Sequence, residues 1–128
     1  MHFAAFAEGS YGHALWPELE MLPQDIRVNK RRFGAFVPGS SDLHAVLQAR
    51  NIDTLVITGT ATNVCCESTA RDAMMMNYKV IFVADATATY NDDEHNATLG
   101  IMLAMFADVM TTDEVVLRLA GNLTQAAE

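Results

Sequence analysis

Two continuous apolar runs limit how this chain folds more than any other feature. Residues 54–58 read TLVIT and residues 79–84 read KVIFVA. Runs of this length that are rich in β-branched residues are typical of strands. Strands that do not alternate polar and apolar positions are covered on both faces of a sheet. Because the stretch between the runs is long enough for a helix, the two runs predict parallel strands joined by a helical crossover.

The same alternation of strand and helix patterns extends along the rest of the chain. The expected elements are helices over residues 41–50, 63–77 and 93–106, strands over residues 26–29 and 108–110, and a last helix that Thr112 caps and that ends before Gly121. Residues 1–25 contain no strand pattern of comparable quality. The sequence predicts an α/β fold, a doubly wound parallel sheet with helices on both faces, forming one domain over residues 1–128.

Composition narrows the class of protein. The 128 residues are 51% hydrophobic and 19% charged, which is typical of a globular domain. Eight basic residues against sixteen acidic ones give a net charge of -8, which argues against nucleic acid and acidic membrane surfaces as partners. The sequence contains neither a run long enough to span a bilayer nor a signal-peptide pattern. We expect a soluble, cytoplasmic protein.

Candidate site residues follow from the predicted sheet, since doubly wound folds bind ligands beyond the carboxyl ends of their strands. This rule selects Lys30, residues 59–65 and Asp85. The segment GTATNVCC at residues 59–66 joins a strand to a helix that Thr62 or Asn63 is suited to cap. Backbone N–H groups and the helix dipole at such a junction stabilise a thiolate, so the segment predicts a nucleophilic cysteine.

Helical spacing separates the two adjacent cysteines. One apolar stripe of the predicted helix contains Cys66, Ala70, Ala73 and Met74. Cys66 is therefore expected in the core, whereas Cys65 shares another face with Thr69 and Asp72 and is expected to face the crevice. The alternative for both cysteines is a role as small buried hydrophobes. Lys30 is either a site residue or one solvated charge in a basic triplet.

Three segments carry a specific resemblance. They read VNKRRFGAF at residues 28–36, TGTATNVCCESTARDA at residues 58–73 and VIFVADA at residues 80–86. This pattern, within a match over roughly residues 9 to 120, resembles the isochorismatase-like cysteine hydrolase superfamily, which includes nicotinamidases, N-carbamoylsarcosine amidases, and ureidoacrylate or biuret-type amidohydrolases. The family uses an aspartate, a lysine and a cysteine. The resemblance implies that Lys30 is the lysine and that Cys65 is the nucleophile.

The resemblance also implies a cis peptide bond between Thr60 and Ala61. Its expected role is to aim the Ala61 N–H, together with that of Cys65, at a carbonyl oxygen as an oxyanion hole. Thr62 and Asn63 are the expected substrate-binding residues. Asp85 matches an aspartate that mainly holds loop structure in the family, and the same structural role is expected here.

No residue of this sequence matches the family aspartate, which lies at the end of a first strand. The chain is therefore expected to be truncated at its N-terminus relative to the family, with the first strands missing. The family's metal ligands lie in the same region, so neither a metal site nor a cofactor is expected. The four histidines, His2, His13, His44 and His95, are scattered and are expected at the surface or in local hydrogen bonds.

The expected function is cysteine-dependent hydrolysis of the C–N bond of a small amide or ureide through a thioester. An alternative is a catalytically incomplete paralogue or fragment that binds a ligand or partner without turnover, and another is a redox protein that uses both cysteines. A homo-oligomer is expected because the helix near residue 105 is apolar nearly all round. Its apolar residues are Ala97, Ile101, Met102, Leu103, Ala104, Met105 and Phe106. The sequence does not identify the substrate.

Overall fold

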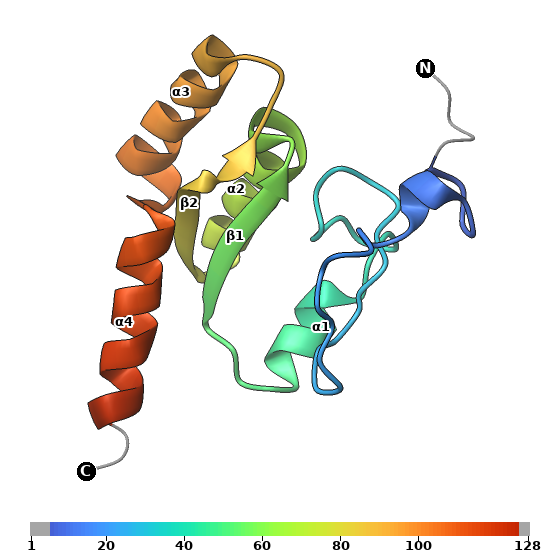
Figure 1. The fold of residues 1–128 in the computed structure, drawn as a ribbon, viewed down its shortest axis with the longest axis horizontal. Helices are drawn as coiled ribbons and strands as arrows, with labels where there is room; N and C mark the ends of the chain where they lie inside the picture. Colours follow the sequence, from blue (N-terminus) through green and yellow to red (C-terminus); the bar gives the residue numbers. More distant parts are fainter. Residues whose placement is uncertain (1–5, 126–128) are drawn as a thin grey trace.

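A parallel sheet lies at the centre of the computed structural model, which describes residues 6–125 (Figure 1). Its strands are β1 (Thr54–Thr60), β2 (Lys79–Ala88) and β3 (Asp108–Met110), in the order β1-β2-β3. Both neighbouring pairs are parallel. The strands predicted over residues 54–58, 79–84 and 108–110 are therefore confirmed, and β2 extends further because its pairing with β1 resumes after a register shift.

Helices cover both faces of this sheet. They are α1 (Leu43–Gln48), α2 (Glu67–Met75), α3 (Asp92–Ile101) and α4 (Thr112–Gln125), with a 3₁₀ turn, η2 (Tyr11–His13), and two π-helical turns, η3 (Thr62–Cys66) and η4 (Met102–Phe106). The helix predicted over residues 63–77 corresponds to η3 and α2, and that over residues 93–106 to α3 and η4. In Figure 1, α3 and α4 follow one another along one side, and α1 lies on the other side with residues 6–40.

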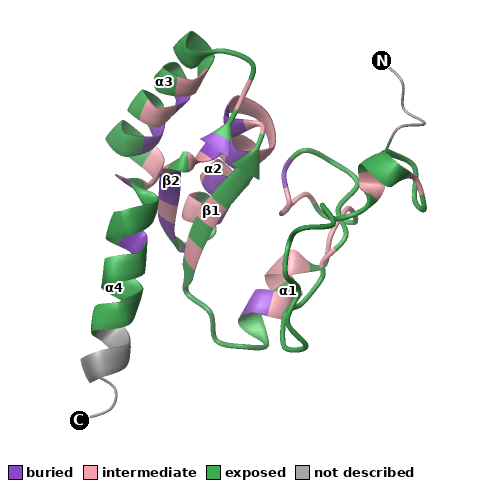
Figure 2. Ribbon diagram, viewed as in Figure 1, coloured by how far each residue is buried: buried purple, intermediate pink, exposed green. Residues whose placement is uncertain are grey.

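Two apolar clusters form the core, one on each face of the sheet. The larger cluster contains Phe36, Leu47, Cys66, Ala70, Ala73, Tyr78, Val80, Phe82 and Met102, and the smaller one contains Val83, Met110 and Val115. Strand β2 supplies alternate residues to the two clusters, since Val80 and Phe82 belong to the first and Val83 to the second. Figure 2 shows this burial concentrated on α2 and β2. The predicted doubly covered α/β sheet is thus confirmed at β2.

Strand β1 is less buried than its sequence predicts. Leu55 and Ile57 pack against the larger cluster, but Val56 between them is 42% exposed. The expectation of burial on both faces is wrong here because α4 packs on β2 and leaves the second face of β1 uncovered within the described residues. Within the same residues, the sheet order also leaves the outer edge of β1 without a partner strand.

The strand predicted over residues 26–29 is absent from the structure. These residues run without regular secondary structure, and Ile26 is 47% exposed. The prediction is wrong because a short apolar segment becomes a strand only by pairing with a neighbour, and the sheet places none beside it.

The last helix differs from its predicted limits at both ends. Its N-cap is Thr111, whose hydroxyl oxygen accepts from the Glu114 N–H at 3.3 Å while the Glu114 carboxylate accepts from the Thr111 N–H at 2.7 Å. Thr112 is therefore the first helical residue and not the cap. The helix also continues through Gly121, which is not among the residues with positive φ, whereas a terminating glycine usually adopts the left-handed conformation.

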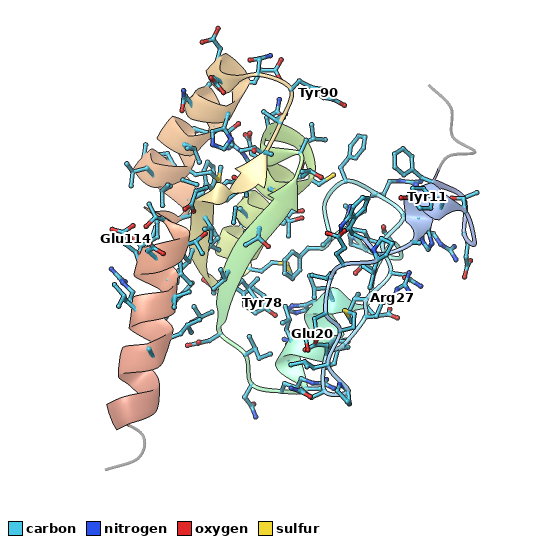
Figure 3. The ribbon with its side chains drawn as sticks, in the orientation of Figure 1. Tyr11, Glu20, Arg27, Tyr78, Tyr90 and Glu114 are labelled. Atoms are coloured by element: carbon cyan, nitrogen blue, oxygen red, sulfur yellow. The ribbon has the colours of Figure 1, made fainter. Side chains whose placement is uncertain are left out.

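An aromatic trio connects α1 to the sheet. The Phe36 and Tyr78 rings lie 5.5 Å apart, and His44 Nδ1 lies 2.9 Å from the Tyr78 hydroxyl. Figure 3 shows Tyr78 between the sheet and α1. His44 is thus hydrogen-bonded to a residue distant in the sequence and not to a local partner, and the trio holds the segment that follows Lys30 against the core.

Candidate active site

The connection from β1 to α2 carries the candidate nucleophile. Strand β1 ends at Thr60, the Thr60–Ala61 peptide bond is cis, and η3 then carries both cysteines into α2. The expected cis bond is confirmed. Just before it, Gly59 has a φ of 114°, a backbone conformation that side chains with a Cβ rarely adopt. This connection therefore requires a glycine one residue before the cis bond.

The two cysteines have different surroundings. Cys66 is 4% exposed, belongs to the larger core cluster, and its Sγ lies 3.7 Å from the Thr58 carbonyl oxygen. Burial and, to a smaller extent, the neighbouring Cys65 raise the pKa of the Cys66 thiol to about 11, against a lowering by Lys30. Cys65 is half-buried, and both thiols are free. The predicted division into a core Cys66 and a more accessible Cys65 is confirmed.

Lys30 lies in a loop and is exposed. Its ammonium donates to the carbonyl oxygens of Arg32 and Phe33, each at 3.0 Å, so the side chain turns back over its own loop. Because the Lys30 charge lowers the pKa of Cys66, the ammonium is within electrostatic reach of η3. The structure thus relates the Lys30 charge to Cys66, and the catalytic role of Lys30 stays a prediction.

Thr69 joins the loop after Lys30 to the helix segment that carries Cys65. Its hydroxyl donates to the Cys65 carbonyl oxygen at 2.7 Å and accepts from the Ala35 N–H at 3.1 Å. Sequence reasoning placed Thr69 on the face of Cys65 but missed this link. A threonine four residues after a helical cysteine is the signal, because its hydroxyl then reaches back to the cysteine carbonyl.

The same loop passes close to α2 at Gly34. A Cβ added at Gly34 would lie 3.1 Å from Asp72 Oδ2, which is tighter than ordinary contacts. Glycine therefore allows the loop that carries Lys30 to approach α2, the helix that follows Cys65.

The side chains of Thr62 and Asn63 are engaged inside the protein. Thr62 is fully buried, and its Oγ1 lies 2.9 Å from His95 Nδ1. Asn63 donates to Glu94 at 2.9 Å and accepts from the Thr89 hydroxyl at 2.6 Å. Their substrate-binding role stays a prediction.

The expectation that Thr62 or Asn63 caps the helix is wrong. Ala61 is the N-cap residue of η3, and no side chain caps this end. Both candidate capping side chains are instead held by groups on or near α3. His95 is hydrogen-bonded, but its partner Thr62 is not local and was not foreseen because the two residues are far apart in the sequence.

Asp85 has a structural role, as expected. One of its carboxylate oxygens accepts from the Thr112 N–H at 2.7 Å and from the Thr112 hydroxyl at 2.9 Å. These bonds tie β2 to the start of α4, and they lower the pKa of Asp85, the Thr112 hydroxyl contributing most.

Metal-ligating and membrane-spanning features were also sought among residues 6–125. No group of three or more His, Cys, Asp or Glu side chains is arranged there to hold a metal ion. In the same part of the chain, no helix combines the length and the hydropathy needed to cross a bilayer. The oxyanion-hole role of the Ala61 and Cys65 N–H groups and the absence of a cofactor stay predictions.

The sequence matches relatives over part of their length. The chain is 43% identical over 98 residues to the isochorismatase family protein YwoC of Bacillus subtilis, covering 77% of this chain and 51% of the relative. It is 36% identical over 98 residues to Nicotinamidase 3 of Arabidopsis thaliana, covering 77% and 48%. It is 41% identical over 107 residues to the ureidoacrylate amidohydrolase RutB of Caulobacter vibrioides, covering 83% and 47%. The chain thus spans about half the length of these relatives.

A solved structure gives the same result for the fold. The crystal structure of a cysteine hydrolase from Pseudomonas syringae pv. phaseolicola matches with a TM-score of 0.85 at 32% identity, covering 93% of this chain and 62% of that one. The family model described as the isochorismatase domain matches residues 3–114. The family model covers most of the sequence, and the solved structure has the same fold. The chain belongs to the isochorismatase family.

Proposed function

We propose that this chain forms the cysteine-bearing part of a hydrolase that cleaves the C–N bond of a small amide or ureide. The observation that carries the proposal is the half-buried Cys65 thiol in the turn that directly follows the end of a parallel strand, and the Lys30 charge acts on the adjacent thiol of Cys66. Parallel α/β sheets bind their ligands at this end. Relatives named nicotinamidase and ureidoacrylate amidohydrolase support the amide and ureide class.

The proposed reaction has two steps. In the first, the Cys65 thiolate attacks the carbonyl carbon, the C–N bond breaks, and the nitrogen leaves as ammonia or an amine after taking up a proton. In the second, water attacks the thioester, releases the carboxylic or carbamic acid and regenerates the thiol. The N–H groups of Ala61 and Cys65 hold the developing oxyanion, and the Lys30 ammonium stabilises the thiolate.

A second candidate is a chain that binds ligand or partner without turnover. It is favoured by the coverage of about half of each relative and by the uncovered edge of β1 among the described residues. The resemblance assigns proton transfer to an aspartate that no residue here matches. Loss of one member of a catalytic group of this kind costs several orders of magnitude in rate.

Ammonia release distinguishes the two candidates. The chain is incubated with nicotinamide, ureidoacrylate, biuret and N-carbamoyl amino acids, and ammonia is measured over time. Hydrolysis by a Cys65 nucleophile predicts release that Cys65→Ala abolishes. The matched control, Cys66→Ala, changes the adjacent thiol and is expected to retain turnover. Release that survives Cys65→Ala would contradict the proposal.

The proposal carries expectations about partners and location. The partner is a small molecule, and the assembly is a homo-oligomer that buries apolar residues of η4. A nucleophilic thiolate requires a reduced cysteine, so we place the protein in the cytoplasm. Nucleic acid and membranes are not proposed as partners, in keeping with the net charge of -8.

A further inference from the structure

A polar cluster at the start of α3 holds the segment that carries Cys65. Its first contact joins Thr62 Oγ1 to His95 Nδ1 at 2.9 Å. Thr62 is fully buried, so its hydroxyl depends on a protein partner in place of water. Thr62 also directly follows Ala61, the second residue of the cis peptide bond. The orientation of this turn is therefore linked to the position of one imidazole on α3.

The second contact fixes the next residue at both ends of its amide group. Asn63 donates to Glu94 at 2.9 Å and accepts from the Thr89 hydroxyl at 2.6 Å. Glu94 belongs to the first turn of α3, which the Asn91 side chain caps by accepting from the Glu94 N–H at 2.9 Å. The Asn63 side chain thus links η3 to the start of α3 and to the segment before it.

A third contact lies on the other side of Cys65. The Thr98 hydroxyl of α3 donates to Glu67 at 2.9 Å, and the other oxygen of that carboxylate accepts from Arg71 at 2.7 and 2.9 Å. Residues of α3 therefore hold the chain both before and after Cys65. The holding residues Glu94, His95 and Thr98 occupy neighbouring positions on one face of α3, at i, i+1 and i+4.

We propose that His95 is a positioning residue that, with the Asn63 contacts, orients η3 so that the Cys65 thiol is presented for reaction. His95 acts through Thr62 and does not touch the substrate. The role in turnover rests on the proposed function, whereas the reactivity of the Cys65 thiol can be measured without any substrate. In this proposal the side chains of Thr62 and Asn63 hold η3 in place through their hydrogen bonds to residues on or near α3.

The test compares two histidines that make the same kind of contact. His95 Nδ1 lies 2.9 Å from a threonine hydroxyl beside the cysteines, and His44 Nδ1 lies 2.9 Å from the Tyr78 hydroxyl at α1. His95→Leu and the matched control His44→Leu are treated with iodoacetamide at one fixed pH, and the Cys65 adduct is quantified by peptide mass mapping. Thermal unfolding of each variant reports the loss of stability separately.

His95→Leu is expected to slow Cys65 alkylation about fivefold, the rate effect that corresponds to the loss of one hydrogen bond. His44→Leu is expected to lower the melting temperature and to leave the alkylation rate within about twofold. His95→Gln, whose amide can bond to the Thr62 hydroxyl, is expected to restore most of the rate. An unchanged alkylation rate in a folded His95→Leu variant, or no recovery in His95→Gln, would overturn the proposal.

A double variant keeps the test decisive if His95→Leu does not fold. Thr62→Val combined with His95→Leu replaces the hydrogen bond by an apolar contact and leaves no buried polar group without a partner. The same loss of Cys65 reactivity is expected, and its absence counts against the proposal. With a substrate that releases ammonia, His95→Leu is expected to lower kcat and leave KM within about twofold. Absence of turnover in every variant would contradict the proposed function only, because the alkylation result would still decide the role of His95.

Discussion

At the scale of single residues, the adjacent cysteines of η3 differ in burial because they lie on different faces of the helical turn. Cys66 packs in the core, where burial and the neighbouring thiol raise its pKa to about 11. Cys65, one position earlier, is half-buried at the turn that follows β1. Helical spacing predicts this division, because a rotation of about 100° per residue separates neighbours around a helix.

The two thiols are expected to react differently with iodoacetamide. With a pKa of about 11, Cys66 would be roughly 1% thiolate at pH 9, and its side chain is also shielded from the reagent. We therefore expect one equivalent of reagent at that pH to modify Cys65. Peptide mass mapping of the native protein measures the site, with the unfolded protein as the control in which both thiols react. Preferential labelling of Cys66 in the native protein would contradict the assignment of faces.

At the scale of secondary-structure elements, two carboxylates hold the start of α4, one from β2 and one from the first turn of α4 itself. Asp85, at the end of the buried part of β2, accepts two hydrogen bonds from Thr112, and Glu114 accepts from the N–H and hydroxyl of Thr111. These bonds favour the ionised carboxylates. They lower the pKa of Asp85, mainly through the Thr112 hydroxyl, and that of Glu114, mainly through the Thr111 N–H.

The first turn of α4 is expected to loosen in acid. Because both folded-state pKa values are lowered, their stabilisation is present above the ordinary values of 3.8 and 4.5 and is lost as the pH falls through the folded values. Protection of the first-turn amides against hydrogen exchange, corrected for intrinsic rates, measures this loss. Asp85→Asn should remove part of the pH dependence. The control Asp92→Asn, which changes an exposed acid at the start of α3, should leave it intact. Equal pH dependence in both variants would be evidence against this role of Asp85.

At the scale of the whole molecule, the turn η4 leaves some of its apolar side chains exposed. Leu103 and Met105 of η4 are 66% and 65% exposed, whereas Met102 of the same turn is fully buried. The turn therefore has one face in the core and another that is apolar and uncovered. The sequence-based expectation of an apolar helix end agrees with this arrangement, and the oligomer itself stays a prediction.

We expect a homo-oligomer that buries these residues. Light scattering at micromolar concentration should give a mass above that of one chain, and Leu103→Glu with Met105→Glu should shift it to the monomer. A charge placed at Tyr90, which is 90% exposed between β2 and α3, provides the control and should leave the mass unchanged (Figure 3). A monomeric mass for the unaltered chain would contradict the prediction.

The second prediction at this scale concerns the length of the active chain. A form extended upstream, which supplies a first strand and its aspartate, is expected to release ammonia faster than the 128-residue chain by several orders of magnitude. Cys65→Ala serves as the control in both forms. Robust turnover by the short chain that depends on Cys65 would mean that another acid replaces the family aspartate, and this prediction would then be wrong.

The sequence by itself determined the elements with strong local patterns. The strands at residues 54–58 and 79–84 follow from continuous apolar runs. The helix that begins near Asn63 and the faces of Cys65 and Cys66 follow from apolar positions at helical spacing. The cis bond before Ala61 followed from the resemblance alone. These features depend on residues close together in the sequence.

Only the tertiary structure decided what depends on distant segments. Residues 26–29 are not a strand because no neighbour pairs with them, and the second face of β1 is exposed because α4 lies over β2. The partners of Thr62 and Asn63 come from residues more than 25 positions away. Hydrogen-bond partners depend on where the intervening chain passes. Periodicity does not encode that path, so the contacts around Cys65 emerge only from the folded chain.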